Sequence, residues 1–198
     1  FIFLALNNTL NKTNLTIKEL ENLLIAFTID SKGKTFNEIS DILDYCRYSA
    51  TTIGRLVLEL SGNNTEKNIY LSDQICIALQ LINFSQDIYK DASMLQRSYI
   101  PDHYMRRFQV KYEDLVSQKD SKELLALSNG LVKLAQHKLI IGSKLPDNIK
   151  GLLGFELKLT INAGKKLCKM LLARNNSFSM IKLNKINWLE VLIKSIIY

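Results

Sequence analysis

Proline and glycine are scarce in this sequence, with two prolines and eight glycines among 198 residues. Both residue types interrupt regular structure, and here they fall between long stretches with a helical apolar period. Strand patterns, in which apolar and polar residues alternate, are weak throughout. These two shortages predict an all-α fold, an antiparallel helical assembly that forms a single domain over residues 1–198.

Patterns of cysteine and histidine that hold zinc are also missing. Cys46, Cys76 and Cys168 are far apart and form no CxxC pair, and His103 and His137 form no HExxH motif. A zinc site is therefore not expected. No secretory leader is recognisable, so the odd cysteine count favours a reduced, cytoplasmic compartment.

The chain has no uncharged apolar run of the 18 residues that would cross a bilayer, and its net charge is +7. Basic excess suits nucleic acid, anionic lipid or a diphosphate, although a solvated basic face is the ordinary explanation. Lysines outnumber arginines 20 to 6, and aromatic residues do not alternate with them as base stacking requires. We therefore expect no nucleic-acid partner, but peripheral contact with the inner face of the membrane is compatible with the sequence.

Apolar periodicity and turn residues divide the chain into helices. The expected order is helices at 17–30, 37–60, 72–96, 101–117, 121–140 and 149–174, and a short final one that contains Trp188. The third is expected to begin at Ser72 and Asp73 and to end before Pro101. The opening "FIFLAL" is only a short apolar stretch.

The third helix carries an unusual polar stripe. Gln80, Asn83, Asp87 and Asp91 are spaced by three, four and four residues, which places them within a sector roughly 80° wide. Apolar residues occupy nearly all the remaining directions around the helix axis, and a helix of that kind is normally buried. A solvated surface explains such a stripe about as well as an internal cation-binding cavity does.

An aspartate pair at i and i+4 is suited to Mg²⁺, which binds one or two carboxylates, retained waters and substrate phosphates. The pair alone is a weak signal, because many exposed helices carry one. The second helix adds Tyr45, Ser49 and Thr52 on one face, and Gly54, which permits another helix to approach closely. These features favour capture of a diphosphate, although a core tyrosine is an equally ordinary explanation for the first.

Three segments, "DYCRYSATTIGRLVLEL" (44–60), "SDQICIALQLINFSQD" (72–87) and "RSYIP" (97–101), resemble in order and spacing the squalene/phytoene synthase family. The branch they resemble most is the bacterial squalene (hydroxysqualene) synthases of hopanoid biosynthesis. Its opening motif is echoed by "FLALNNT" (3–9) and its C-terminal motif by "ELKLTINAG" (156–164). The resemblance covers essentially the whole chain.

This resemblance implies an all-α isoprenoid synthase fold with a central cavity. It also implies Mg²⁺-assisted ionisation of presqualene diphosphate, followed by capture of water to give hydroxysqualene on the way to squalene and hopanoids. Within the family, the alternative is head-to-head condensation of two prenyl diphosphates such as farnesyl diphosphate, as in phytoene or squalene synthesis. Other enzymes of the squalene pathway are the implied partners.

Residue roles also follow from the resemblance. Asp87 and Asp91 match the second aspartate-rich motif, which binds Mg²⁺ and through it the diphosphate. Gln80 and Asn83 match polar residues that line the same cavity. Tyr45 matches the tyrosine that steers proton transfer or stabilises the cationic intermediate.

Three further residues are implied to bind substrate. Arg97 and Tyr99 match the R-x-Y-[LI]-P segment at the mouth of the site, and Arg55 matches the Gly-Arg of the branch. Arginine suits phosphate oxygens because its guanidinium is a rigid fork of donors.

The chain departs from the family in the metal-binding half of the site. The first aspartate-rich motif would lie upstream of residues 3–9, and Asp30 stands alone in the sequence. Thr35 and Phe36 replace an Arg-Tyr pair, Thr51 and Thr52 replace Asn-Pro, and Ala163 replaces a glycine. We therefore expect an N-terminally truncated fragment that is inactive by itself; a non-catalytic paralogue is the competing hypothesis.

Overall fold

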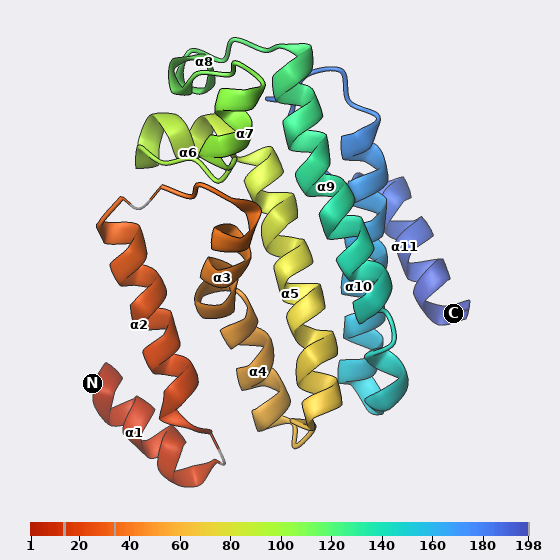
Figure 1. Ribbon diagram of the computed structural model, residues 1–198. Coiled ribbons are helices and arrows are strands. Elements are labelled where there is room, and N and C mark those ends of the chain that lie inside the picture. The colour runs from red at the N-terminus through yellow and green to blue at the C-terminus, as the bar shows by residue number, and fades with distance from the viewer. Residues whose placement is uncertain (14, 34, 198) are drawn as a thin grey trace.

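The computed structural model describes residues 1–13, 15–33 and 35–197, and these residues form helices and connecting segments without a strand. Eleven α-helices and one 3-10 helix lie in this part of the chain (Figure 1). They are α1 (Ile2–Lys12), α2 (Ile17–Ser31), α3 (Ile39–Ser49), α4 (Thr51–Leu60), α5 (Glu66–Gln86), α6 (Ile88–Leu95), α7 (Asp102–Arg107), α8 (Tyr112–Val116), α9 (Lys122–Gly142), η1 (Pro146–Asn148), α10 (Gly151–Leu172) and α11 (Lys185–Ile197). The all-α prediction is confirmed.

Helix α5 is the centre of the assembly. It packs along α9 and α4 and also contacts α3 and α10, while α10 packs on α9 and α11 packs on α10. Most of its apolar side chains are buried, as expected for a helix that is apolar on nearly all sides. Its buried apolar residues are Leu71, Ile75, Ile77, Ala78, Leu81, Ile82 and Phe84.

The connections place α6, α7 and α8 together above one end of α5 and α3, at the top of Figure 1. Helices α1 and α2 lie at one side of the assembly and α11 at the other. Helix α1 has no buried residue, whereas α2 packs on α3 and α4. The end of α5 that faces α6 is therefore where elements distant in sequence meet.

Two of the expected helices are interrupted. The span 37–60 forms α3 and α4, which meet at Ala50. The hydroxyls of Thr51 and Thr52 donate to the carbonyls of Arg47 and Tyr48, both at 2.9 Å. Such back-bonding competes with the regular helical hydrogen bonds and bends helices.

The third expected helix starts earlier than Ser72 and breaks before its expected end. Thr65 caps α5, because its side chain accepts a hydrogen bond from the backbone N–H of Asn68, so the helix begins at Glu66 rather than at Ser72. At the other end the helix stops at Gln86, and α6 begins after Asp87. The expected region 101–117 is likewise two short helices, α7 and α8, and residues 2–12, which were not expected to be helical, form α1.

No helix in the described ranges is both long enough and apolar enough to pass through a bilayer.

A glycine allows α4 and α5 to approach closely, as the sequence predicts. A Cβ atom added to Gly54 would overlap the Ser72 side chain and lie 2.6 Å from the Cys76 Sγ atom. Gly130 in α9 has no other heavy atom within 4 Å of such a Cβ. The two glycines can therefore be compared, because Gly54 is closely packed and Gly130 has free space beside it.

We predict that Gly54→Ala lowers the free energy of unfolding by about 1–3 kcal/mol, because α4 must move away from α5. Gly130→Ala should raise it by about 0.5–1 kcal/mol, because alanine is the better helix former and meets no neighbour. Urea unfolding of both variants followed by circular dichroism tests this pair. An unchanged or raised stability for Gly54→Ala would contradict the close packing of the two helices.

Candidate active site

The two carboxylates of the predicted aspartate pair flank a break between helices. Asp87 is the junction of α5 and α6, and Asp91 lies in the first turn of α6, where its negative charge suits the positive end of the helix dipole. The backbone N–H of Asp91 still donates to the Asp87 carbonyl, at 2.7 Å. The i, i+4 relation is thus kept, and Asp91 is only 8% exposed.

A buried arginine stabilises this break. The carbonyl of Ser85, which has lost its helical partner, accepts from the Arg174 guanidinium at 2.9 Å and from the Ser128 hydroxyl at 3.4 Å. Arg174 also donates to Ser128, and it is 7% exposed. Because the last carbonyls of a helix need partners outside it, Arg174 lets α5 end one residue before Asp87.

The carboxylate of Asp30 brings three parts of the chain together. Its Oδ1 atom accepts a hydrogen bond from the Tyr45 hydroxyl at 2.9 Å and lies 2.8 Å from the Arg97 guanidinium. Asp30 is in the last turn of α2, Tyr45 is in α3, and Arg97 follows α6. Gln96, at φ 51°, turns the chain between α6 and Arg97 in the left-handed conformation.

Four aromatic rings pack beneath this contact. Phe84 and Tyr99 stack with ring centroids 3.8 Å apart, and Phe36 and Tyr45 lie 5.5 and 5.7 Å from Tyr99. The Arg97 guanidinium sits over the Tyr99 ring at 5.4 Å. Burial raises the pKa of both Tyr45 and Tyr99, so both hydroxyls stay protonated at neutral pH.

The charges near Asp91 form one electrostatic group, which we name the carboxylate–arginine cluster: Asp30, Asp87, Asp91 and Arg97. Burial, together with the negative charges of Asp87 and Asp30, raises the pKa of Asp91 to about 6, although the positive charges of Arg97 and Lys90 oppose the shift. Of these carboxylates, Asp30 is the one that contacts Arg97 directly. Within residues 1–13, 15–33 and 35–197, no set of three or more histidine, cysteine or acidic side chains is close enough to hold a metal ion. A cation here would depend on oxygen ligands from a bound substrate as well.

Burial differs along the predicted polar stripe, in which Asp87 is half-buried and Asp91 is buried. Gln80 is half-buried, and Asn83, one turn before Asp87, is exposed. Both lie on the same face of the helix as Asp87, because they precede it by seven and four residues. The stripe is therefore neither wholly solvated nor wholly internal, and burial increases along it from Asn83 to Asp91.

Arg55 joins three helices. Its guanidinium binds both carboxylate oxygens of Asp73, at 3.0 and 2.7 Å, and lies 3.5 Å from Glu19. Asp73 is 14 residues before Asp87 in the same chain, which is about 21 Å along a helix. Arg55 thus connects α4 to α5 and α2, and its contact with substrate stays a prediction.

Two residues of the site were not found from the sequence, namely Asp30 and Phe36. One signal at Asp30 was available, because an acidic side chain in the last turn of a helix opposes the helix dipole. A local rule broken in this way often marks a functional position. Phe36 gave no such signal, because its packing on Tyr45 and Tyr99 depends on contacts between distant segments.

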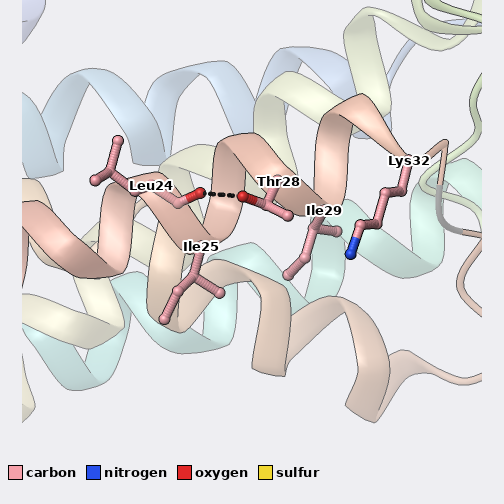
Figure 2. A pocket seen from close by; sticks show the side chains of 5 residues that line it. All are labelled: Leu24, Ile25, Thr28, Ile29 and Lys32. Carbon is pink, nitrogen blue, oxygen red and sulfur yellow. Dashed lines mark hydrogen bonds between the residues drawn. The ribbon is translucent and has the colours of Figure 1, made fainter.

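A hollow of about 630 Å³ lies along α2 and its C-cap, away from the carboxylates, and is lined by Leu24, Ile25, Thr28, Ile29 and Lys32 (Figure 2). The Thr28 hydroxyl donates to the carbonyl of Leu24 at 2.8 Å, so its polar group is already satisfied. This hollow offers a largely apolar surface with the amine of Lys32 at one end.

Some proteins of known identity are similar to this chain in sequence, and others are similar to it in fold. Hydroxysqualene synthase of Sinorhizobium fredii is 30% identical over 171 residues, which are 86% of this chain and 58% of that protein. Hydroxysqualene synthase of Rhodopseudomonas palustris is 32% identical over 168 residues, 84% of this chain and 57% of that protein. The chain therefore spans a little more than half the length of these relatives.

A crystal structure of squalene synthase from Alicyclobacillus acidocaldarius superposes with a TM-score of 0.81 at 29% identity, covering 90% of this chain and 67% of that one. A dehydrosqualene synthase solved with a ligand superposes with a TM-score of 0.80 at 19% identity, covering 98% and 69%, and shows the fold alone. The sequence profile described as squalene/phytoene synthase matches residues 1–187. The chain belongs to the squalene/phytoene synthase family.

Proposed function

We propose that this chain provides one metal-binding and diphosphate-binding wall of a hydroxysqualene synthase, which ionises presqualene diphosphate and captures water. The observation that carries the proposal is the carboxylate–arginine cluster, set at a helix break over stacked aromatic rings. The likeness to two hydroxysqualene synthases supports the choice of reaction.

The donor set of the cluster fits Mg²⁺. Asp87 and Asp91 present hard oxygen ligands. Burial and the charge of Asp87 raise the pKa of Asp91, and a divalent cation would offset the repulsion between the two carboxylates. When bound, Mg²⁺ would neutralise the charge of the departing diphosphate. Two protein carboxylates are sufficient, because substrate phosphates and water complete the coordination of this ion.

Arg97 is placed to orient the diphosphate. Its guanidinium is held by Asp30 and by the Tyr99 ring, so its direction is fixed before substrate binds. Its Nε atom is buried without a hydrogen-bond partner. A positioned cation of this kind stabilises negative charge without reorganisation during the reaction. Gln80 and Asn83 would line the approach along α5.

The aromatic rings would serve the other half of the reaction. A carbocation needs an apolar enclosure until water is admitted, and ring faces attract positive charge. The Tyr45 hydroxyl donates a hydrogen bond to Asp30, which fixes the direction of that hydroxyl beside the rings. This arrangement suits the role that the family resemblance gives Tyr45.

Binding of inorganic diphosphate tests the proposed wall. We predict that the chain binds it in a Mg²⁺-dependent way and that Asp87→Asn weakens this binding at least about tenfold, because a ligand oxygen loses its charge. Asparagine is a good helix-start residue, so the break at this position should remain. Isothermal titration with and without Mg²⁺ measures the effect.

Asp44→Asn is the control, because Asp44 is exposed on α3 and pairs only with the exposed Arg47. It should leave binding unchanged. Equal Mg²⁺-linked binding by wild type and Asp87→Asn, or no such binding by the wild type, would contradict the proposed wall. If the protein turns over, consumption of presqualene diphosphate rather than farnesyl diphosphate alone separates water capture from condensation.

Asp91 predicts a pH-dependent stability in metal-free protein. Its folded-state pKa of about 6 lies above the ordinary value of 3.8, so the unfolded chain loses the proton first as pH rises. The free energy of unfolding should fall between pH 4 and pH 6 by at most about 3 kcal/mol and then stay level. Asp91→Asn should remove that fall and be the more stable protein at pH 7.

Urea unfolding at several pH values in the presence of EDTA measures this dependence. Asp44→Asn again serves as the control and should keep the wild-type profile. A profile of Asp91→Asn that parallels the wild type would show that the Asp91 carboxylate is not held in a desolvated, negatively charged setting.

A further inference from the structure

The connection between α10 and α11 crosses the end of α5 and binds it at two places. The Arg174 guanidinium donates to the Ser85 carbonyl at 2.9 Å, and the backbone N–H of Ile181 donates to the Gln86 side chain, also at 2.9 Å. The two acceptors are the residues that immediately precede Asp87. One connection, almost 90 residues away in sequence, therefore holds the last two residues of α5.

The same connection is anchored at the start of α9. The backbone N–H of Ser177, a fully buried residue, donates to the Asp120 carboxylate at 3.2 Å. Arg174 donates to the carbonyl of Ser179 at 3.4 Å, within the connection, and to the hydroxyl of Ser128 in α9. Arg174 thus lies in a fixed frame formed by α5, α9 and its own connection.

The charge of Arg174 is buried at a cost that stability alone does not explain. The side chain belongs to a residue that is 7% exposed, and burial lowers its pKa, although the charge of Asp120 opposes the shift. Buried ionic groups can often be replaced by well-packed apolar residues without loss of stability. Within the described ranges, the hydrogen-bond acceptors of Arg174 are neutral oxygens, those of Ser85, Ser128 and Ser179.

An arginine supplies directed donors at the negative end of a helix. The last carbonyls of α5 carry the negative end of its dipole, and a guanidinium has several N–H groups in one plane, so it can bind three oxygens at once. In a continuous helix, the Ser85 carbonyl would accept from the N–H of Tyr89, four residues later. Arg174 takes the place of that donor, and α6 leaves the line of α5 (Figure 1).

The direction of α6 decides where the charges of the site lie. Asp91 is in the first turn of α6, and Arg97, which follows α6, lies 2.8 Å from Asp30. We propose that Arg174 is a positioning residue of the Mg²⁺ and diphosphate site, because it holds the break from which α6 takes its direction; this assignment rests on the function proposed above. Arg174 acts through the backbone of α5 and not by contact with metal or substrate.

Arg174→Met tests this role, because methionine is long and flexible but has no charge and no N–H donor on its side chain. We predict that it weakens Mg²⁺-linked binding of inorganic diphosphate at least about tenfold, since groups that orient metal ligands commonly contribute that much. Arg174→Lys should keep binding within about threefold of the wild type, because its ammonium can still donate to the Ser85 carbonyl. Isothermal titration of protein shown to be folded by circular dichroism measures both.

Leu145→Ala is the control for a general loss of stability. Leu145 is fully buried, and it follows α9 at the end opposite to Ser128. Its truncation leaves a cavity that destabilises the fold without touching the break. Diphosphate binding by folded Leu145→Ala should therefore equal that of the wild type.

The backbone at Asp87 gives a second readout that needs no ligand. Asp87 lies outside regular helical geometry, at φ −91° and ψ 16°, and the Cα chemical shift in NMR depends on these angles. In Arg174→Met this shift should move toward a helical value, because the Ser85 carbonyl becomes free to accept from Tyr89. It should stay unchanged in Arg174→Lys and in Leu145→Ala.

Wild-type binding and an unmoved Asp87 shift in folded Arg174→Met would overturn the proposal, as would equal weakening of binding by Leu145→Ala. If Arg174→Met does not fold, Ser128→Ala takes its place, because Ser128 contacts both Arg174 and the Ser85 carbonyl. Ser128→Ala should weaken binding about threefold, and unchanged binding would contradict the assignment. Absence of Mg²⁺-linked binding from the wild type would overturn the proposed function, and the Asp87 shift would then still decide whether Arg174 holds the break.

Discussion

A single carboxylate oxygen of Asp30 meets both the hydroxyl of Tyr45 and the guanidinium of Arg97, and the geometry of the candidate site depends on that meeting. Each partner comes from a different element, so the contact fixes the end of α2 against α3 and against the segment after α6. All three groups are at least partly buried, and a buried polar group without a partner is costly. Asp30 therefore orients Arg97 and Tyr45 before any substrate arrives, and the aromatic rings below them fill the space that would otherwise admit water.

The helix break at Asp87 is the second constraint, and it is supported from the opposite side of the molecule. The Ser85 carbonyl is held by Arg174 and Ser128, and the backbone N–H of Ile181 donates to the Gln86 side chain at 2.9 Å. Residues after α10 thus determine where α5 ends, and through it where Asp91 lies. This dependence explains how a carboxylate pair can be placed accurately although it lies at a junction and not within a continuous helix.

Much of the fold could be predicted from the sequence, because helical periodicity and scarce breakers are local signals. The long central helices and the closely packed Gly54 follow from such signals, and so does the close spacing of Asp87 and Asp91. The breaks at Ala50 and Asp87 could not be predicted in the same way, since they depend on hydroxyl back-bonding and on an arginine almost 90 residues away. The ion pair of Arg55 with Asp73 could not be predicted either, because a motif names a residue type and not its partner, which is seen only in the fold.

The coupling between Asp30 and Arg97 is the most direct test of this account. A double-mutant cycle with Asp30→Asn, Arg97→Gln and the double variant, measured by urea unfolding, isolates the interaction between the two side chains. The account predicts a favourable coupling energy of about 1–3 kcal/mol, because the pair is partly buried and also holds Tyr45. A coupling energy within about 0.3 kcal/mol of zero would contradict it and would mean that Arg97 is positioned by other contacts.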